Sequence, residues 1–212
     1  MNETSSEGDI QYHEGIPLIK CGIFLWYFFM RMGGIILKTL TTRNIVLAAF
    51  FLALGFVLPF FTAQIPSIGS MLLPMHLPVL ICGFVCGWPL GLIVGAILPL
   101  LRSAIFGMPP MFPTAIAMAF ELAAYGALTG LLYQLLSKKP LNTYISLIGA
   151  MLGGRIVWGL VSAVLYGASG KAFGLAVFMA GAFTNAVPGI ILQIIIVPIL
   201  ILTLEKSHLI KR

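Results

Sequence analysis

Apolar residues fill most of the chain between residues 44 and 204, and short polar or proline-containing stretches divide them into six segments. These segments are 44–63, 76–88, 89–106, 112–136, 141–167 and 173–204. A transmembrane helix needs about 20 predominantly apolar residues, and most of the segments reach or approach that length. The second is short, and the last is long enough to be tilted or to extend past the bilayer. The pattern predicts an all-α polytopic membrane protein with six transmembrane helices.

Composition and charge agree with this prediction. The chain is 60% hydrophobic and 8% charged, whereas soluble domains carry about 25% charged residues. The net charge of +6 does not indicate nucleic-acid binding, because the basic residues gather at segment ends, as they do on the cytoplasmic side of membrane proteins. They are Lys38, Arg43, Lys138, Lys139, Lys206, Lys211 and Arg212. This bias predicts that both termini are cytoplasmic, with Lys171 the one exception.

The first 37 residues differ from the rest of the chain. Residues 1–14 hold four of the six acidic residues and are typical of a disordered polar leader. The apolar run 21–30 is too short to span a membrane and favours an interfacial helix. Alternatively translation starts later, since Gly33, Gly34 and Leu37 are what an in-frame ribosome-binding sequence and start codon would encode. We predict an N-terminal extension over 1–37, a six-helix membrane domain over 38–206 and a basic cytoplasmic tail over 207–212.

Small residues recur at the spacing of one helical turn. Gly83, Gly87, Gly91 and Gly95 are four residues apart, and Gly126 with Gly130 forms a further pair. Small side chains at this spacing let helix backbones approach closely in a bilayer. The glycines therefore predict internal packing between helices. Pro89 interrupts the series and predicts a turn between the second and third segments.

Glu121 is the single acidic residue between Leu40 and Leu204, a stretch that also holds six basic residues. An ionised carboxylate is costly to bury in hydrocarbon unless it has a partner. Arg102 and Arg155 are the arginines that could meet it. The three charges sum to a net positive, and a ligand carboxylate would supply the missing negative charge. We predict a binding site for an anionic ligand; the alternative is an ion-pair network that only joins helices.

The remaining candidates lie near these charges in the predicted helices. At about 1.5 Å per residue, Glu121, Arg155 and Asn185 fall near the midplane or in the outer half of the bilayer. Pro188 breaks helical bonding beside Asn185, which favours a cavity there. The pattern predicts a pocket open to the outside, with aromatic residues and a histidine around the charges. The predicted substrate-binding residues are Glu121, Arg155, Arg102, Asn185, Trp158, Tyr125 and His76.

Motifs for catalysis and for metal binding are not found in the sequence. The chain has no P-loop and no second acid in the apolar region for acid–base chemistry. Cys82 and Cys86 are one helical turn apart, but their segment offers no acid to complete a metal site. We predict no catalytic residues, no metal and no cofactor. An intramembrane enzyme stays an alternative only if Glu121 and His76 lie within about 4 Å of each other.

Several blocks of sequence together resemble the substrate-binding S component of an energy-coupling factor (ECF) vitamin transporter, over about residues 38 to 206. They are Thr41-Thr-Arg43-Asn, Ala49-x-x-x-Ala53, Met75-His-Leu-Pro-Val-Leu-Ile-Cys-Gly83, Pro99-Leu-Leu-Arg102-Ser and Gly107-Met-Pro-Pro-Met-Phe-Pro-Thr-Ala115-Ile-Ala-Met-Ala-Phe-Glu121. The last two blocks are the more specific. The extension over 1–37 departs from the compact start that is usual in this family.

The resemblance implies a six-helix subunit of a prokaryotic plasma membrane that captures a vitamin or vitamin precursor from outside. It implies a shared module of one transmembrane coupling subunit and two ATPases as partners, so that ATP is hydrolysed elsewhere and the chain itself is not an enzyme. Ala49 and Ala53 would face the coupling subunit, and the loop 64–75 would close over the substrate. The positive pocket favours an anionic vitamin such as pantothenate, nicotinate or a folate. A ligand-free structural subunit is the further alternative.

Overall fold

The structure is a computed structural model that describes residues 40–62, 72–137, 139–170 and 174–207. These residues belong to the compact unit Thr39–Arg212. The predicted extension over 1–37 and most of the tail over 207–212 lie outside the described residues, as does most of the loop 64–75. Those interpretations stay predictions.

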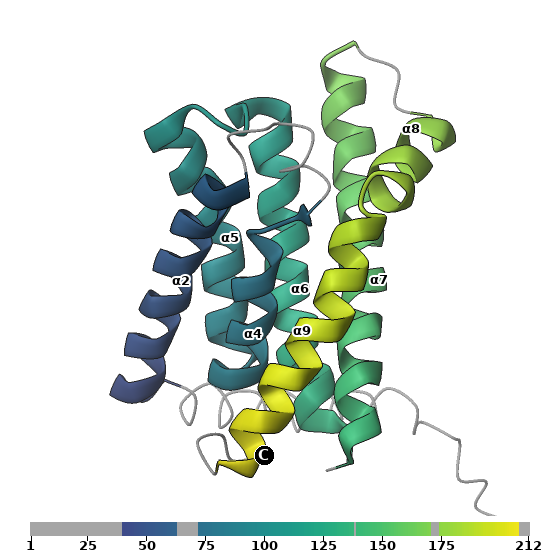
Figure 1. Cartoon of the computed structure of the whole chain (residues 1–212). Helices are drawn as coiled ribbons and strands as arrows, with labels where there is room; N and C mark the ends of the chain where they lie inside the picture. Colours follow the sequence, from purple (N-terminus) through teal and green to yellow (C-terminus); the bar gives the residue numbers. More distant parts are fainter. Residues whose placement is uncertain (1–39, 63–71, 138, 171–173, 208–212) are drawn as a thin grey trace, which may run out of the picture. The chain divides into compact units, whose positions relative to one another are not determined.

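The described part of the chain consists of helices and the short connections between them (Figure 1). The longer ones are α2 (Thr42–Thr62), α4 (His76–Cys86), α5 (Trp88–Phe106), α6 (Ile116–Leu135), α7 (Pro140–Ala168) and α9 (Val187–Lys206). Three short elements complete them: the π-helical turns η1 (Met111–Ala115) and η2 (Ala180–Thr184), and the helix α8 (Leu175–Met179). The all-α fold predicted from the sequence is confirmed.

Five of the helices are long and apolar enough to cross a membrane, and α4 is a shorter apolar helix. The predicted second segment is therefore present, but with only 11 helical residues. Within the predicted last segment, 173–204, the helix is interrupted before Val187, as the sequence around Pro188 predicted, and α9 is the part that is long enough to cross. The interruption falls beside Pro188, which lacks the N–H that a continuous helix would need.

Successive long helices run in opposite directions, so that α2 begins and α9 ends at the same end of the bundle (Figure 1). Arg43 in the first turn of α2, Lys139 before α7 and Lys206 at the end of α9 all lie at this end. The described connections at the other end, residues 72–75, 107–110, 169–170 and 174, carry no lysine or arginine. This arrangement agrees with the predicted cytoplasmic side of the basic residues.

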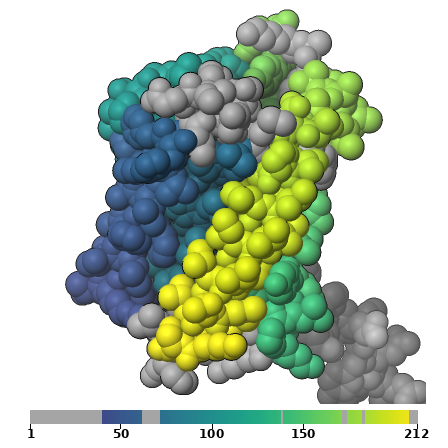
Figure 2. Space-filling view, in the orientation of Figure 1, coloured from purple at the N-terminus to yellow at the C-terminus, as the bar shows by residue number. Residues whose placement is uncertain are grey.

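Helix α6 is central, because it packs closely against α5 and α7 and also contacts α4. Helix α9 lies obliquely against α4 and α7 and covers one face of the bundle (Figure 2). One apolar core forms between α2, α4 and α5, with Leu122 of α6, and includes Cys82 and Cys86. A second joins α4, α6, α7 and α9 around Tyr125 and Leu147. Glu121 and its neighbours lie on the helices that border this second core.

Glycines allow the close contact between α4, α5 and α6. A side chain on Gly83 would place its Cβ 2.6 Å from the carbonyl oxygen of Gly126. A side chain on Gly126 would in turn collide with the backbone of Gly91. Packing must hold helices together in lipid, because burial of apolar surface gives little net drive there. The predicted role of these glycines in internal packing is confirmed, and α4 ends at Cys86 before the predicted turn.

Candidate binding site around Glu121

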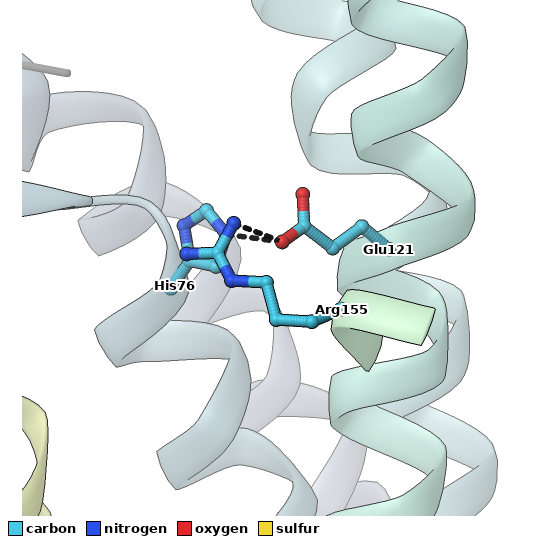
Figure 3. Close-up of polar contacts among 3 residues, drawn as sticks. All are labelled: His76, Glu121 and Arg155. Carbon is cyan, nitrogen blue, oxygen red and sulfur yellow. Dashed lines mark ion pairs between the residues drawn. The ribbon is translucent and has the colours of Figure 1, made fainter. Parts of the chain in front are cut away.

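Glu121 forms the centre of a buried polar cluster (Figure 3). Its Oε1 atom lies 2.8 Å from Nη1 of Arg155 and 3.5 Å from Nε2 of His76. The side chains of Glu121 and His76 are each 2% exposed, and that of Arg155 is 7% exposed. The prediction that the lone acid meets Arg155 is confirmed, and His76 joins them.

Three different helices supply the cluster. His76 is the first residue of α4, Glu121 lies in the second turn of α6 and Arg155 lies halfway along α7. Gly154 brings the backbone of α7 close to α6, since a Cβ there would lie 2.9 Å from the ring of Tyr125. The ring of Tyr125 in turn meets that of His76 edge to face, with centroids 5.2 Å apart. The predicted residues His76, Glu121, Tyr125 and Arg155 therefore lie together.

The cluster keeps hydrogen-bonding capacity that no described residue uses. Nε and Nη2 of Arg155 and both ring nitrogens of His76 are buried and have no hydrogen-bond partner among the described residues. Buried polar atoms in native proteins are nearly always hydrogen-bonded, because an unpaired one carries its full desolvation penalty. A guanidinium edge with two donors matches the two oxygens of a carboxylate. The cluster therefore keeps two guanidinium donors that a ligand with acceptor oxygens could use.

Arg102 does not meet Glu121, contrary to the prediction. Its Nη1 donates a hydrogen bond to the carbonyl oxygen of Phe56 over 3.0 Å. Its guanidinium also lies over the rings of Phe60 and Phe106, 5.2 and 5.6 Å from their centroids. Arg102 thus joins α2 to α5, because a backbone carbonyl and two aromatic faces satisfy the cation. The Glu121 cluster therefore lacks the second arginine on which the predicted excess of positive charge rested.

Asn185 and Trp158 lie outside this cluster in the described contacts. Asn185 is exposed in the turn between η2 and α9, where its backbone N–H donates to the carbonyl of Ala180. Trp158 stacks on Phe178 with ring centroids 6.1 Å apart, so it packs α7 against α8. Their predicted substrate contacts are not tested by these positions and stay predictions.

A cleft of about 130 Å³ lies beside the cluster, between α6, α7 and α9. Tyr125 and Arg155 line it together with Met151 and Ile194, among others. Sequence reasoning missed Met151 and Ile194. Met151 could have been predicted, because it lies one turn before Arg155 on the same helix and so on the same face. Helical spacing alone cannot show which apolar residue of α9 faces the cleft, so Ile194 could not have been predicted.

A second surface feature involves the small residues of α2. Ala49 and Ala53 are both exposed and line a shallow groove of about 280 Å³ between α2 and α5. Phe56 and Leu101 also border this groove. Nothing bulky covers the two alanines within the described residues, so a partner helix could approach closely there.

The fold and the cluster together define a class: a multi-pass α-helical membrane protein with an ionisable site buried between its helices. The protein-family model described as "ECF transporter, substrate-specific component" matches residues 43–201, and the chain belongs to this family. A search among curated proteins and a search among solved structures each returned no match. Members of the family are transport subunits and not enzymes. The 3.5 Å between His76 and Glu121 satisfies the distance that the enzyme alternative required, but the family assigns the chain to transport.

Replacing Arg102 with glutamine is expected to lower stability by about 1–3 kcal/mol and to leave ligand affinity unchanged. The variant loses the cation that lies over two aromatic rings and a hydrogen bond to the Phe56 carbonyl. Thermal unfolding and ligand titration of the purified protein measure the two effects, with Arg102→Lys as the charge-preserving control. A large loss of affinity at unchanged stability would instead support the predicted substrate contact.

Proposed function

We propose that the chain is the high-affinity binding subunit for a vitamin or vitamin precursor with an anionic group. The observation that carries this proposal is that Nε and Nη2 of Arg155 have no hydrogen-bond partner among the described residues. The arginine lies in a buried cluster, paired with the carboxylate of Glu121. Glu121 holds the guanidinium of Arg155 in place through its Nη1 atom. The edge formed by Nε and Nη2 is left to bind a ligand. His76, 3.5 Å from the same carboxylate, adds a further polar side chain beside it.

In this proposal Glu121 is a positioning residue and does not touch the anion, because two carboxylates side by side would repel each other. Its Oε1 atom contacts both basic side chains at once. The carboxylate therefore fixes the direction of two donors, His76 and Arg155. A neutral or cationic ligand would require the opposite arrangement, with Glu121 facing the ligand.

We further propose that the subunit works in a prokaryotic plasma membrane with a transmembrane coupling subunit and two ATPases. The exposed alanines of α2 support a docking surface at the groove between α2 and α5. Small residues allow a helix of the partner to lie close to α2, and close packing is what holds helices together in lipid. The groove is lined by α2 and α5, whereas the cluster lies on α4, α6 and α7.

Replacing Ala49 with tryptophan is expected to abolish ATP-driven uptake and to leave ligand binding unchanged. The bulky side chain would fill the groove that the coupling subunit needs, on helices that carry none of the three cluster residues. Uptake into proteoliposomes that hold the complete transporter measures the first effect, and titration of the isolated subunit measures the second. Val164→Trp is the matched control, since Val164 on α7 is 71% exposed and outside the groove.

Three outcomes would contradict the proposed docking surface. The first is uptake by Ala49→Trp at the wild-type rate. The second is an equal loss of uptake in Val164→Trp, because that would trace the effect to bulk on any lipid-facing helix. Loss of binding as well as uptake in Ala49→Trp would also count against the assigned role.

A further inference from the structure

The cleft beside the polar cluster has walls that are almost entirely apolar. Its aliphatic and methionine lining comes from α7 and α9: Ile148, Met151, Leu152, Ile190 and Ile194. Among the described residues, Tyr125 and Arg155 complete the lining. Arg155 is the one charged side chain and Tyr125 the one with a hydroxyl group among these described residues, so a ligand body in the cleft meets mainly hydrocarbon. Hydroxyl or amide groups on its body would lose their water without gaining partners, which is unfavourable.

The size of the cleft limits the body of such a ligand. Its volume is about 130 Å³, and an engineered cavity of about 150 Å³ with similar walls binds benzene. One ring, or one branched chain of similar volume, therefore fits. Ile148 and Leu152 are 44% and 50% exposed, so the cleft opens on the side of the bundle.

The position of Arg155 argues against a phospholipid as the occupant. Arg155 lies near the middle of the 29-residue helix α7, which places it about 20 Å from either end at the rise of a helix. A phosphate anchored at the membrane surface does not reach that depth, since the hydrocarbon core alone is about 30 Å thick. A small free acid has no such anchor.

Resting on the proposed binding function, we propose that the substrate is a small monocarboxylic acid whose body is a single apolar ring or a compact branched chain. Its carboxylate lies at the Nε and Nη2 edge of Arg155, and its body lies in the cleft between α7 and α9. This class is narrower than anionic vitamins in general. It leaves out hydroxylated acids, dicarboxylates and molecules of several rings.

The test uses the full-length protein in lipid nanodiscs and calorimetric titration with benzoate, cyclohexanecarboxylate and benzamide. Both carboxylates are expected to bind at least about 10-fold more tightly than the neutral amide, the difference that one charge-assisted pair provides. Ile194→Trp, which fills the cleft, is expected to weaken benzoate binding by about 10-fold or more. Ile195→Trp is the matched control on the same helix, because Ile195 is 54% exposed and does not line the cleft.

Leu152→Trp provides a second variant that fills the cleft from α7, in case Ile194→Trp does not fold. Equal binding of benzamide and benzoate would overturn the proposal, as would unchanged affinity in both cleft variants. Binding of a hydroxylated or multi-ring anion that Ile194→Trp does not affect would overturn it too, while the proposed function would stand. If no small molecule of any class binds the wild-type protein, the proposed function fails together with it.

Discussion

Replacing Arg155 with glutamine is expected to abolish ligand binding and to destabilise the protein by about 3–5 kcal/mol. The substitution removes the side chain that lies 2.8 Å from Glu121 and leaves a carboxylate that is 2% exposed with His76 as its remaining basic neighbour. Removing one partner of a buried ion pair is costly because the other charge stays desolvated. Thermal unfolding and titration of the purified variant measure both losses.

The double variant Glu121→Gln with Arg155→Gln separates folding from binding. It removes both charges of the pair at once, so neither charge is left desolvated without its partner, and the two amide side chains can hydrogen-bond to each other. We expect it to unfold near the wild-type temperature and still fail to bind ligand. Wild-type affinity in this folded double variant would contradict the role assigned to Arg155, and the cluster would then be a structural link between α6 and α7.

Replacing Gly126 with alanine is expected to destabilise the helix bundle by about 3 kcal/mol or more, beyond the usual range for overpacking. The added methyl group would collide with the backbone of Gly91 on α5, which has no flexible side chain to move away. Helix α6 would have to shift, and Glu121 would shift with it. Thermal unfolding of the purified protein measures the effect, and ligand titration follows the site.

Gly167→Ala is the matched control for this variant. Gly167 lies in the last turn of α7, and a Cβ there would meet nothing within 4 Å. Alanine should be neutral there or stabilise the helix by about 0.5–1 kcal/mol, because glycine loses more backbone freedom on folding. If Gly126→Ala and Gly167→Ala unfolded at the same temperature, the contact between α5 and α6 would not depend on the absence of a side chain at Gly126.

Much of the fold follows from the lengths of the apolar segments and from the glycines. The pairing of Glu121 with Arg155 was predictable for an energetic reason: a lone acid in an apolar bundle must find a base. The position of His76 was open to prediction as well, because it begins the short helix α4 at the same end as the start of α6.

The parts that were not predictable depend on how each helix is rotated about its axis. Arg102 could equally have faced α6, but the carbonyl oxygen of Phe56 and two phenylalanine rings, one on α2 and one on α5, bind its guanidinium instead. The interruption near Pro188 was expected, yet the exposure of Asn185 depends on how α8 packs against α7. A single sequence carries little information about such rotations, since lipid and protein neighbours are both apolar.

Native mass spectrometry of the purified full-length protein tests the central claim most directly, with the Glu121→Gln, Arg155→Gln double variant measured alongside it. We predict that the wild-type protein carries a small-molecule adduct that is absent from the folded double variant. A wild-type protein without any adduct and without thermal stabilisation by a panel of vitamins and small carboxylic acids would contradict the account. The same adduct at equal occupancy in both proteins would contradict the assigned site.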